Sequence, residues 1–143
     1  MTNISFYILK GDIEYDRQVF ACRLASKAYY QGKHVYIHTD NAKHSEQLNQ
    51  TLWSFRPDSF LPHSIMAEPH KDNNDCPILI GHDSTPPRLM DLLINLGHEQ
   101  PLFFSQFDRV AECVNDNDDI KIAGRKRYQF YQQRGYELIT HNI

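Results

Sequence analysis

The stretch ISFYILKGDIEYDRQVFACRLASKAYYQGKHVYIHTD, residues 4–40, contains the pattern that decides the fold. The apolar run at 4–9 predicts a buried strand that ends before Gly11. From 16 to 31 the apolar residues recur with a period near 3.6, which predicts an amphipathic helix stopped by Gly32. A second apolar run, at 33–40, predicts the next strand. Strands joined through a helix in this way run parallel.

The rest of the chain continues the alternation. Further helices are predicted over 41–53 and about 117–134, and further strands over 76–83, 92–96, 109–114 and 136–141. A proline-bearing connection at 54–66 and a polar, exposed loop at 67–77 separate the second helix from the strands that follow. We therefore expect a single α/β domain over residues 1–143, with a mostly parallel sheet covered by helices on both faces.

The composition excludes several classes of protein. The 143 residues are 41% hydrophobic and 12% aromatic, which excludes disorder. A net charge of −3 argues against a protein that coats nucleic acid. The three cysteines, Cys22, Cys76 and Cys113, form no C-x-x-C pair and predict reduced thiols. Because no leader or membrane-length apolar segment is found, we expect a cytoplasmic protein.

Motifs for catalysis and cofactor binding are missing. The first predicted strand is followed by LKGDIEYD, whose single glycine does not make a phosphate-binding loop. His34 and His38 would share one side of a strand, and His82-Asp83-Ser84 lists catalytic residue types in a row. Catalytic triads are assembled from distant positions, so surface or structural roles are expected for these histidines. The sequence predicts no catalytic residue, no cofactor, no metal site and no enzyme activity.

The last predicted helix places Lys121, Arg125, Tyr128 and Gln129 on one stripe, at spacings of one and two turns. Three interpretations fit this stripe: a solvated helix face, a groove for single-stranded nucleic acid, or a socket for an acidic peptide with an aromatic anchor. Residues 118–143 carry five Lys or Arg against three Asp or Glu, a net charge of +2. That excess is modest for a nucleic-acid groove and sufficient for a short acidic tail.

The segment LWSFRPDSFLPH, residues 52–63, contains Trp53, the only tryptophan of the chain. A core position at a helix end and a partly exposed position beside the last helix are both compatible with this segment. In the second case, the indole would form the wall of an apolar pocket with cations at its rim. We expect the second arrangement, a notch between Trp53 and the last helix.

Four stretches together resemble the chi subunit family of bacterial DNA polymerase III. They are FYIL at 6–9, GKHVYI at 32–37, LWSFRPDSFLPH at 52–63, and R-x-R-Y-x-x-Y-x-x-x-G-Y at 125–136. The resemblance implies a Rossmann-like fold without nucleotide binding, a 1:1 complex with the psi subunit, and a role in DNA replication. It also implies binding of the acidic, Pro-Phe-terminated tail of single-stranded-DNA-binding protein.

The resemblance assigns roles to particular residues. Trp53 and Phe60 would form the apolar part of the tail site, Lys121 and Arg125 the positive charge, and Tyr128 a ring. Gln129 stands where a relative has lysine, which implies either weaker binding or a shift of the charge to Lys126 or Arg127. Two alternatives of other classes stay open: an enzyme acting on a nucleotide or phosphate, and a direct binder of single-stranded DNA.

Overall fold

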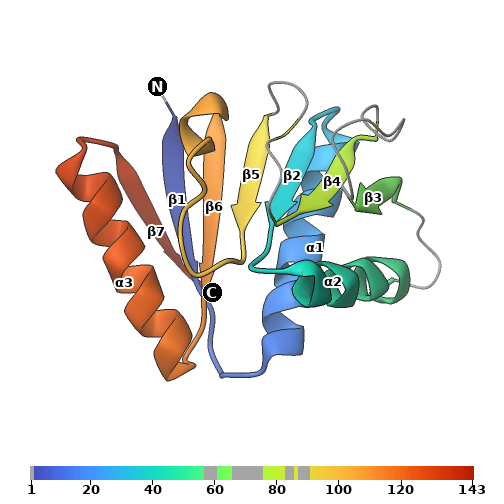
Figure 1. The fold of residues 1–143 in the computed structure, drawn as a ribbon, viewed down its shortest axis with the longest axis horizontal. Coiled ribbons are helices and arrows are strands. Elements are labelled where there is room, and N and C mark those ends of the chain that lie inside the picture. The colour runs from blue at the N-terminus through green and yellow to red at the C-terminus, as the bar shows by residue number, and fades with distance from the viewer. Residues whose placement is uncertain (1, 57–60, 66–75, 83–85, 87–90) are drawn as a thin grey trace.

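The computed structural model describes residues 2–56, 61–65, 76–82, 86 and 91–143. In this part of the chain seven strands form one sheet, in the order β3-β4-β2-β5-β6-β1-β7, and every pair is parallel (Figure 1). The strands are β1 Asn3–Ile8, β2 Val35–His38, β3 His63–Ile65, β4 Ile78–Gly81, β5 Leu92–Asn95, β6 Arg109–Val114 and β7 Leu138–Asn142. The expected parallel α/β architecture is confirmed.

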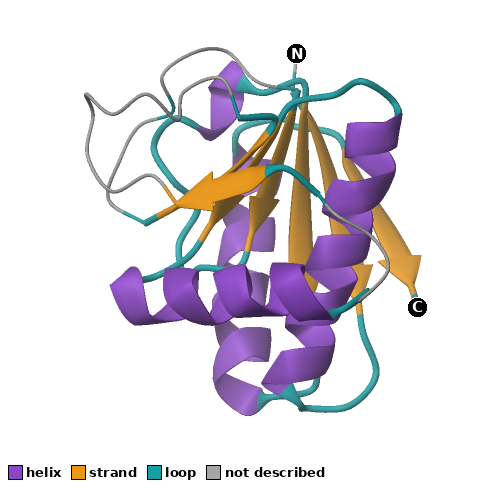
Figure 2. Cartoon of the chain, turned by 90° about the vertical axis from the view of Figure 1, so that its right-hand side faces the viewer, coloured by secondary structure: helices purple, strands orange, loops and turns teal. Residues whose placement is uncertain are grey.

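In the described ranges three α-helices cover the sheet: α1 Glu14–Tyr30, α2 Ala42–Ser54 and α3 Asp118–Gln133. Helices α1 and α2 pack against each other on one face, while α3 and the short 3₁₀ turn Phe104–Gln106 lie on the other (Figures 1 and 2). Helix α1 ends at Tyr30, and Gly32 stops it as predicted: the glycine has a φ of +77°, a conformation that side-chain-bearing residues avoid. Helices on both faces of the sheet are therefore confirmed.

Each face of the sheet has its own hydrophobic core. On the α1 and α2 face, Leu48 and Leu52 of α2 pack with Ile37 and Ile80 of the central strands. On the α3 face the core is more aromatic. It contains Phe6, Tyr36, Phe104, Phe107 and Tyr131, and most of these rings meet edge to face. Side chains alternate between the two faces along each strand, as strand geometry requires.

The expected strands and helices are present within one or two residues for most elements. Strand β5 confirms the strand predicted over 92–96. Strand β3 was not predicted, because three half-buried residues beside Pro62 carry no alternating pattern. The predicted loop at 67–77 falls almost wholly outside the described residues.

Burial sets the chemistry of two of the three cysteines. Cys22 and Cys113 are inaccessible to solvent, and burial raises the pKa of each thiol to about 12. Neither belongs to a disulfide, and Cys76 is half-buried. None of the helices in the described ranges is both long enough and apolar enough for a membrane span.

Candidate functional site

Helix α3 has well-defined ends. Asn117 caps its start, and the Oδ1 atom of Asn117 accepts hydrogen bonds from the N–H groups of Asp119 and Ile120. Asp118 and Asp119 in the first turn interact favourably with the positive end of the helix dipole. The chain leaves the helix through Gly135, which has a φ of +82°. The basic stretch of the sequence is therefore one rigid helix.

Gly124 allows α3 to lie close to the sheet. A Cβ atom at this position would be only 2.9 Å from Cγ2 of Val114 in β6, closer than real Cβ atoms come to a neighbour. Glycine lowers helix stability by about 1 kcal/mol relative to alanine, and the close approach of helix and strand explains its presence here. The approach brings the side chains that flank Gly124 directly over the ends of β1 and β6.

A cavity of about 280 Å³ lies beside Gly124, between α3 and the carboxyl-terminal halves of β6, β1 and β7. Its lining is apolar toward the sheet and charged toward solvent. The lining residues are Phe6, Ile8, Val114, Asn115, Asp116, Lys121, Gly124, Arg125, Tyr128 and Thr140. The ring of Tyr128 meets that of Phe6 edge to face at 5.2 Å, which fixes one wall. We call this cavity the α3 pocket.

Three of the six residues predicted for the site meet in the α3 pocket. Lys121 and Tyr128 are half-buried in its wall, and Arg125 is exposed at the same cavity. Gln129 is exposed on α3 and is not among the lining residues. Phe60 lies outside the described residues. The helical spacing of one and two turns thus grouped Lys121, Arg125 and Tyr128 correctly.

The expected notch between Trp53 and α3 is not formed. Trp53 lies on α2, which packs on the opposite face of the sheet and against β3 and β4 at one end of it. Helix α3 packs against β6 and β7 at the other end (Figure 1). The indole is 53% exposed and meets the ring of His63 in β3 at 4.9 Å. The expectation failed because helical periodicity does not say which face of the sheet a helix will cover.

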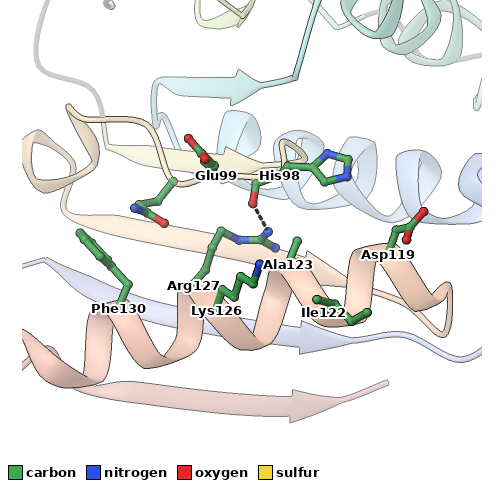
Figure 3. A pocket seen from close by; sticks show the side chains of 9 residues that line it. His98, Glu99, Asp119, Ile122, Ala123, Lys126, Arg127 and Phe130 are labelled. Carbon is green, nitrogen blue, oxygen red and sulfur yellow. Dashed lines mark hydrogen bonds between the residues drawn. The ribbon is translucent and has the colours of Figure 1, made fainter.

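A second hollow, of about 600 Å³, lies on the other side of α3 (Figure 3). It is lined by His98, Glu99, Gln100, Asp119, Ile122, Ala123, Lys126, Arg127 and Phe130. Lys126 is exposed at this hollow, so it does not line the α3 pocket. Figure 3 shows Arg127 directed from α3 toward the loop after β5, where its Nη1 donates to the carbonyl oxygen of His98 at 2.8 Å.

Arg127 is buried in a polar cluster under α3. Its Nε donates to Oε1 of the fully buried Glu112 at 2.8 Å. Oε2 of Glu112 accepts from the hydroxyl of Tyr131 at 2.7 Å, and Nδ2 of Asn95 donates to both carboxylate oxygens. Burial and the Glu112 carboxylate raise the pKa of Tyr131 above its usual value. Arg127 thus fixes α3 to β6, although its Nη2 is buried and has no hydrogen-bond partner among the described residues. Arg127 does not line the α3 pocket, so it does not replace there the positive charge that is missing at Gln129.

Three of the eight histidines, His38, His82 and His98, line a hollow of about 630 Å³ near the carboxyl ends of β2, β4 and β5. Asp40 accepts from the His98 N–H at 2.7 Å and contacts its ring Nδ1 at 2.6 Å. Partial burial raises the pKa of Asp40. The hydrogen bonds and charge of His98, together with the charge of His44, lower the pKa by more than this, so the net pKa lies below its usual value. Within the described ranges, no group of three or more metal-ligating side chains could hold a metal ion.

Phosphate binding finds little support at the N-termini of α1 and α3, whereas the first turn of α2 carries no acidic residue. The first turns of α1 and α3 carry the acids Glu14, Asp16, Asp118 and Asp119. A negatively charged first turn repels the phosphate groups that helix N-termini otherwise attract.

The sequence did not predict the apolar floor of the α3 pocket. Phe6 and Ile8 come from β1 and Val114 from β6, and the exposed Thr140 of β7 completes the lining on that side. Their alternation along β1 was a usable signal, because Ile4, Phe6 and Ile8 share one side of that strand. What was missing was the strand order, which places β1 between β6 and β7.

Comparison with solved structures concerns the fold alone. The crystal structure of T4 UvsW matches 99% of this chain with a TM-score of 0.69 at 11% identity. The match covers 42% of the UvsW chain.

Sequence comparison is more specific. A protein named DNA polymerase III subunit chi from Pseudomonas aeruginosa is 38% identical over 143 residues, covering 100% of this chain and 98% of the relative. The subunits of the same name from Haemophilus influenzae and Escherichia coli are 30% and 28% identical, and the matches cover 96% and 98% of this chain and 95% and 97% of the relatives. The family described as DNA polymerase III chi subunit, HolC, matches residues 1–139. The chain belongs to the DNA polymerase III chi subunit family, whose members are accessory subunits in DNA replication.

Proposed function

We propose that this chain bridges the psi subunit of the clamp loader to single-stranded-DNA-binding protein, without catalysing a reaction itself. The bridge would hold the acidic, Pro-Phe-terminated tail of single-stranded-DNA-binding protein in the α3 pocket. The observation that carries the proposal is that Lys121, Arg125 and Tyr128 line one cavity with an apolar floor. A chain end with an aromatic side chain and negative charge has the complementary chemistry.

The size of the α3 pocket supports a single side chain as its occupant. Its volume of about 280 Å³ lies just below the range of about 300–1,000 Å³ that is typical of small-molecule and cofactor sites. A phenylalanine ring placed against Phe6, Ile8 and Val114 would replace water on the apolar floor. Burial of an aromatic ring is a large favourable term in recognition.

The charges at the pocket support an anionic chain end. The guanidinium of Arg125 can hold a carboxylate through two directed hydrogen bonds, and Lys121 adds a second positive charge. Asp116 lines the same cavity, but its Oδ2 accepts from the Gly11 N–H at 2.8 Å. Cations at a rim speed encounter with an acidic tail and make affinity fall with salt. We expect affinity of about micromolar, near −8 kcal/mol, which suits a contact that must form and release.

A bridge needs a second surface that stays accessible when the tail is bound. The opposite face of the molecule, with the exposed Trp53 at its far end, meets this requirement. The residues that are proposed to bind the tail do not lie on that face.

The proposal is tested by assembling the three partners. Psi carrying an affinity tag should retain this chain, and this chain should in turn retain single-stranded-DNA-binding protein. The matched control is single-stranded-DNA-binding protein that lacks its terminal Pro-Phe, which should not be retained. Retention of both forms to the same extent, or of neither, contradicts the proposal.

A further inference from the structure

Asn115 occupies a particular place in the α3 pocket. It follows β6 directly, lines the cavity and is only 3% exposed. Its Oδ1 accepts from the N–H of Asn117 at 3.0 Å, in a turn that leads into α3. This bond fixes the orientation of the amide, because the oxygen must face the Asn117 N–H. The Nδ2 group then lies on the other side of the side-chain amide.

The Nδ2 atom of Asn115 is buried and has no hydrogen-bond partner among the residues that the structure describes. Buried donors without a partner are rare in folded proteins, and each one calls for an explanation such as a water molecule or a ligand. Here the unpaired donor belongs to a residue that lines a cavity, beside two side chains that carry positive charge. A residue of the cavity wall therefore carries an unpaired neutral donor, in addition to the charged Lys121 and Arg125.

We propose that Nδ2 of Asn115 donates a hydrogen bond to an oxygen of the bound chain end, either its terminal carboxylate or the backbone carbonyl just before it. The inference rests on the proposed function of the α3 pocket and makes Asn115 a specificity-determining residue in it. Arg125 and Lys121 attract any negative charge. An amide N–H below the surface donates only to an oxygen that enters the cavity, and so selects a chain end over an internal acidic segment.

Two substitutions separate this hydrogen bond from simple charge effects. Asn115→Ser keeps an oxygen that can accept from the Asn117 N–H, adds no charge and withdraws the amide donor. We expect it to weaken binding of an acidic Pro-Phe peptide about five- to tenfold. Asn115→Asp keeps the shape but replaces the donor with a negative oxygen, so its loss should be larger. Asn41→Ser is the matched control, because Asn41 makes a similar bond to the His44 N–H on α2, on the opposite face of the sheet, and should leave affinity unchanged.

The same titrations with an amidated peptide identify the oxygen that is bound. If Asn115→Ser weakens the binding of the free-acid peptide more than that of the amidated peptide, the carboxylate is the acceptor. Equal losses of affinity for the two peptides identify the backbone carbonyl as the acceptor. Either result supports the inference. Wild-type affinity in both Asn115 variants, together with binding of the peptide by the wild type, overturns it and leaves the proposed function intact. No binding by the wild type overturns the proposed function itself.

A spectroscopic reading does not depend on how the variants fold. The side-chain amide pair of Asn115 is assigned in a ¹⁵N correlation spectrum of the wild type through its scalar couplings to the Asn115 backbone. Addition of the free-acid peptide to the wild type should shift that pair as the donor gains an acceptor. An unchanged position at saturation contradicts the inference.

Discussion

Arg127 of α3 and Glu112 of β6 form an ion pair with a nitrogen–oxygen distance of 2.8 Å, and both side chains are buried. Arg125, only two residues earlier, is exposed at the α3 pocket. The basic stretch of the sequence therefore contains two kinds of arginine. One fixes the helix to the sheet, and the other is available to a partner.

Loss of the buried pair should reduce stability. In Glu112→Gln the positive charge of Arg127 stays buried without its counter-ion, so the free energy of unfolding should fall by about 3–5 kcal/mol. Urea unfolding measures the change. Glu137→Gln, at an exposed position, is the control and should change stability by no more than about 0.5 kcal/mol. Equal stability of Glu112→Gln and the wild type would show that the pair does not hold α3 in place.

Gly124→Ala tests the close approach of α3 and β6. The added methyl group should force the helix away from Val114, at a cost of about 1–3 kcal/mol. The helix propensity of alanine offsets about 1 kcal/mol of that cost. We expect lower stability and weaker binding of the tail peptide.

A second substitution checks the reason for the effect of Gly124→Ala. Val114→Ala removes the methyl groups that the new Cβ would meet at 2.9 and 3.3 Å. Gly124→Ala should therefore cost less stability in a Val114→Ala background than in the wild type. An equal cost in both backgrounds would rule out the predicted clash.

The two buried thiols should be unreactive at neutral pH. With pKa values of about 12, Cys22 and Cys113 hold almost no thiolate at pH 8, so Cys76 should account for the fast reaction with a disulfide reagent. In Cys76→Ser the fast reaction should vanish, and in denaturant all the thiols present should react. Rapid labelling of the native Cys76→Ser protein would contradict the burial of both other cysteines.

The same pKa values predict a loss of stability in alkali. The folded thiols keep their protons up to about pH 12, whereas unfolded thiols lose them near the reference value of 9.0. Between these values the folded state binds more protons, so the free energy of unfolding falls as pH rises. Urea midpoints of the wild type and Cys22→Ala, measured over this pH range, test the prediction. The stability of the variant should fall less steeply with rising pH than that of the wild type. Equal slopes would contradict the raised pKa of Cys22.

Trp53→Ala should leave tail affinity unchanged, since the indole lies on the face of the sheet opposite to α3. Titration of the variant with the acidic Pro-Phe peptide tests this. A clear loss of affinity in a correctly folded Trp53→Ala protein would mean that the tail reaches the far face as well.

Local patterns of the sequence predicted the helices and strands, and also the wall of the α3 pocket that α3 supplies. Strands such as β6 and helices such as α3 are defined by the spacing of their own apolar residues, and that spacing also grouped Lys121 with Arg125. The floor of the pocket depends on strand order, which no local pattern contains. The burial of Arg127 depends on Glu112, a partner in the preceding strand. Trp53 was placed wrongly for the same reason, because the face that α2 covers is decided by how the chain crosses the sheet.

Calorimetric titration of the acidic Pro-Phe peptide into Arg125→Ala and Lys126→Ala tests the central claim most directly. The two variants remove one positive charge each from neighbouring positions of α3, but only Arg125 lines the α3 pocket. Arg125→Ala should weaken binding by about 1.5–3 kcal/mol, as expected for the loss of a charge-assisted hydrogen bond. Lys126→Ala should cost no more than a few tenths of a kcal/mol, about the value of an exposed charge. Wild-type affinity in Arg125→Ala, or an equal loss in both variants, would contradict the claim that the α3 pocket binds the chain end.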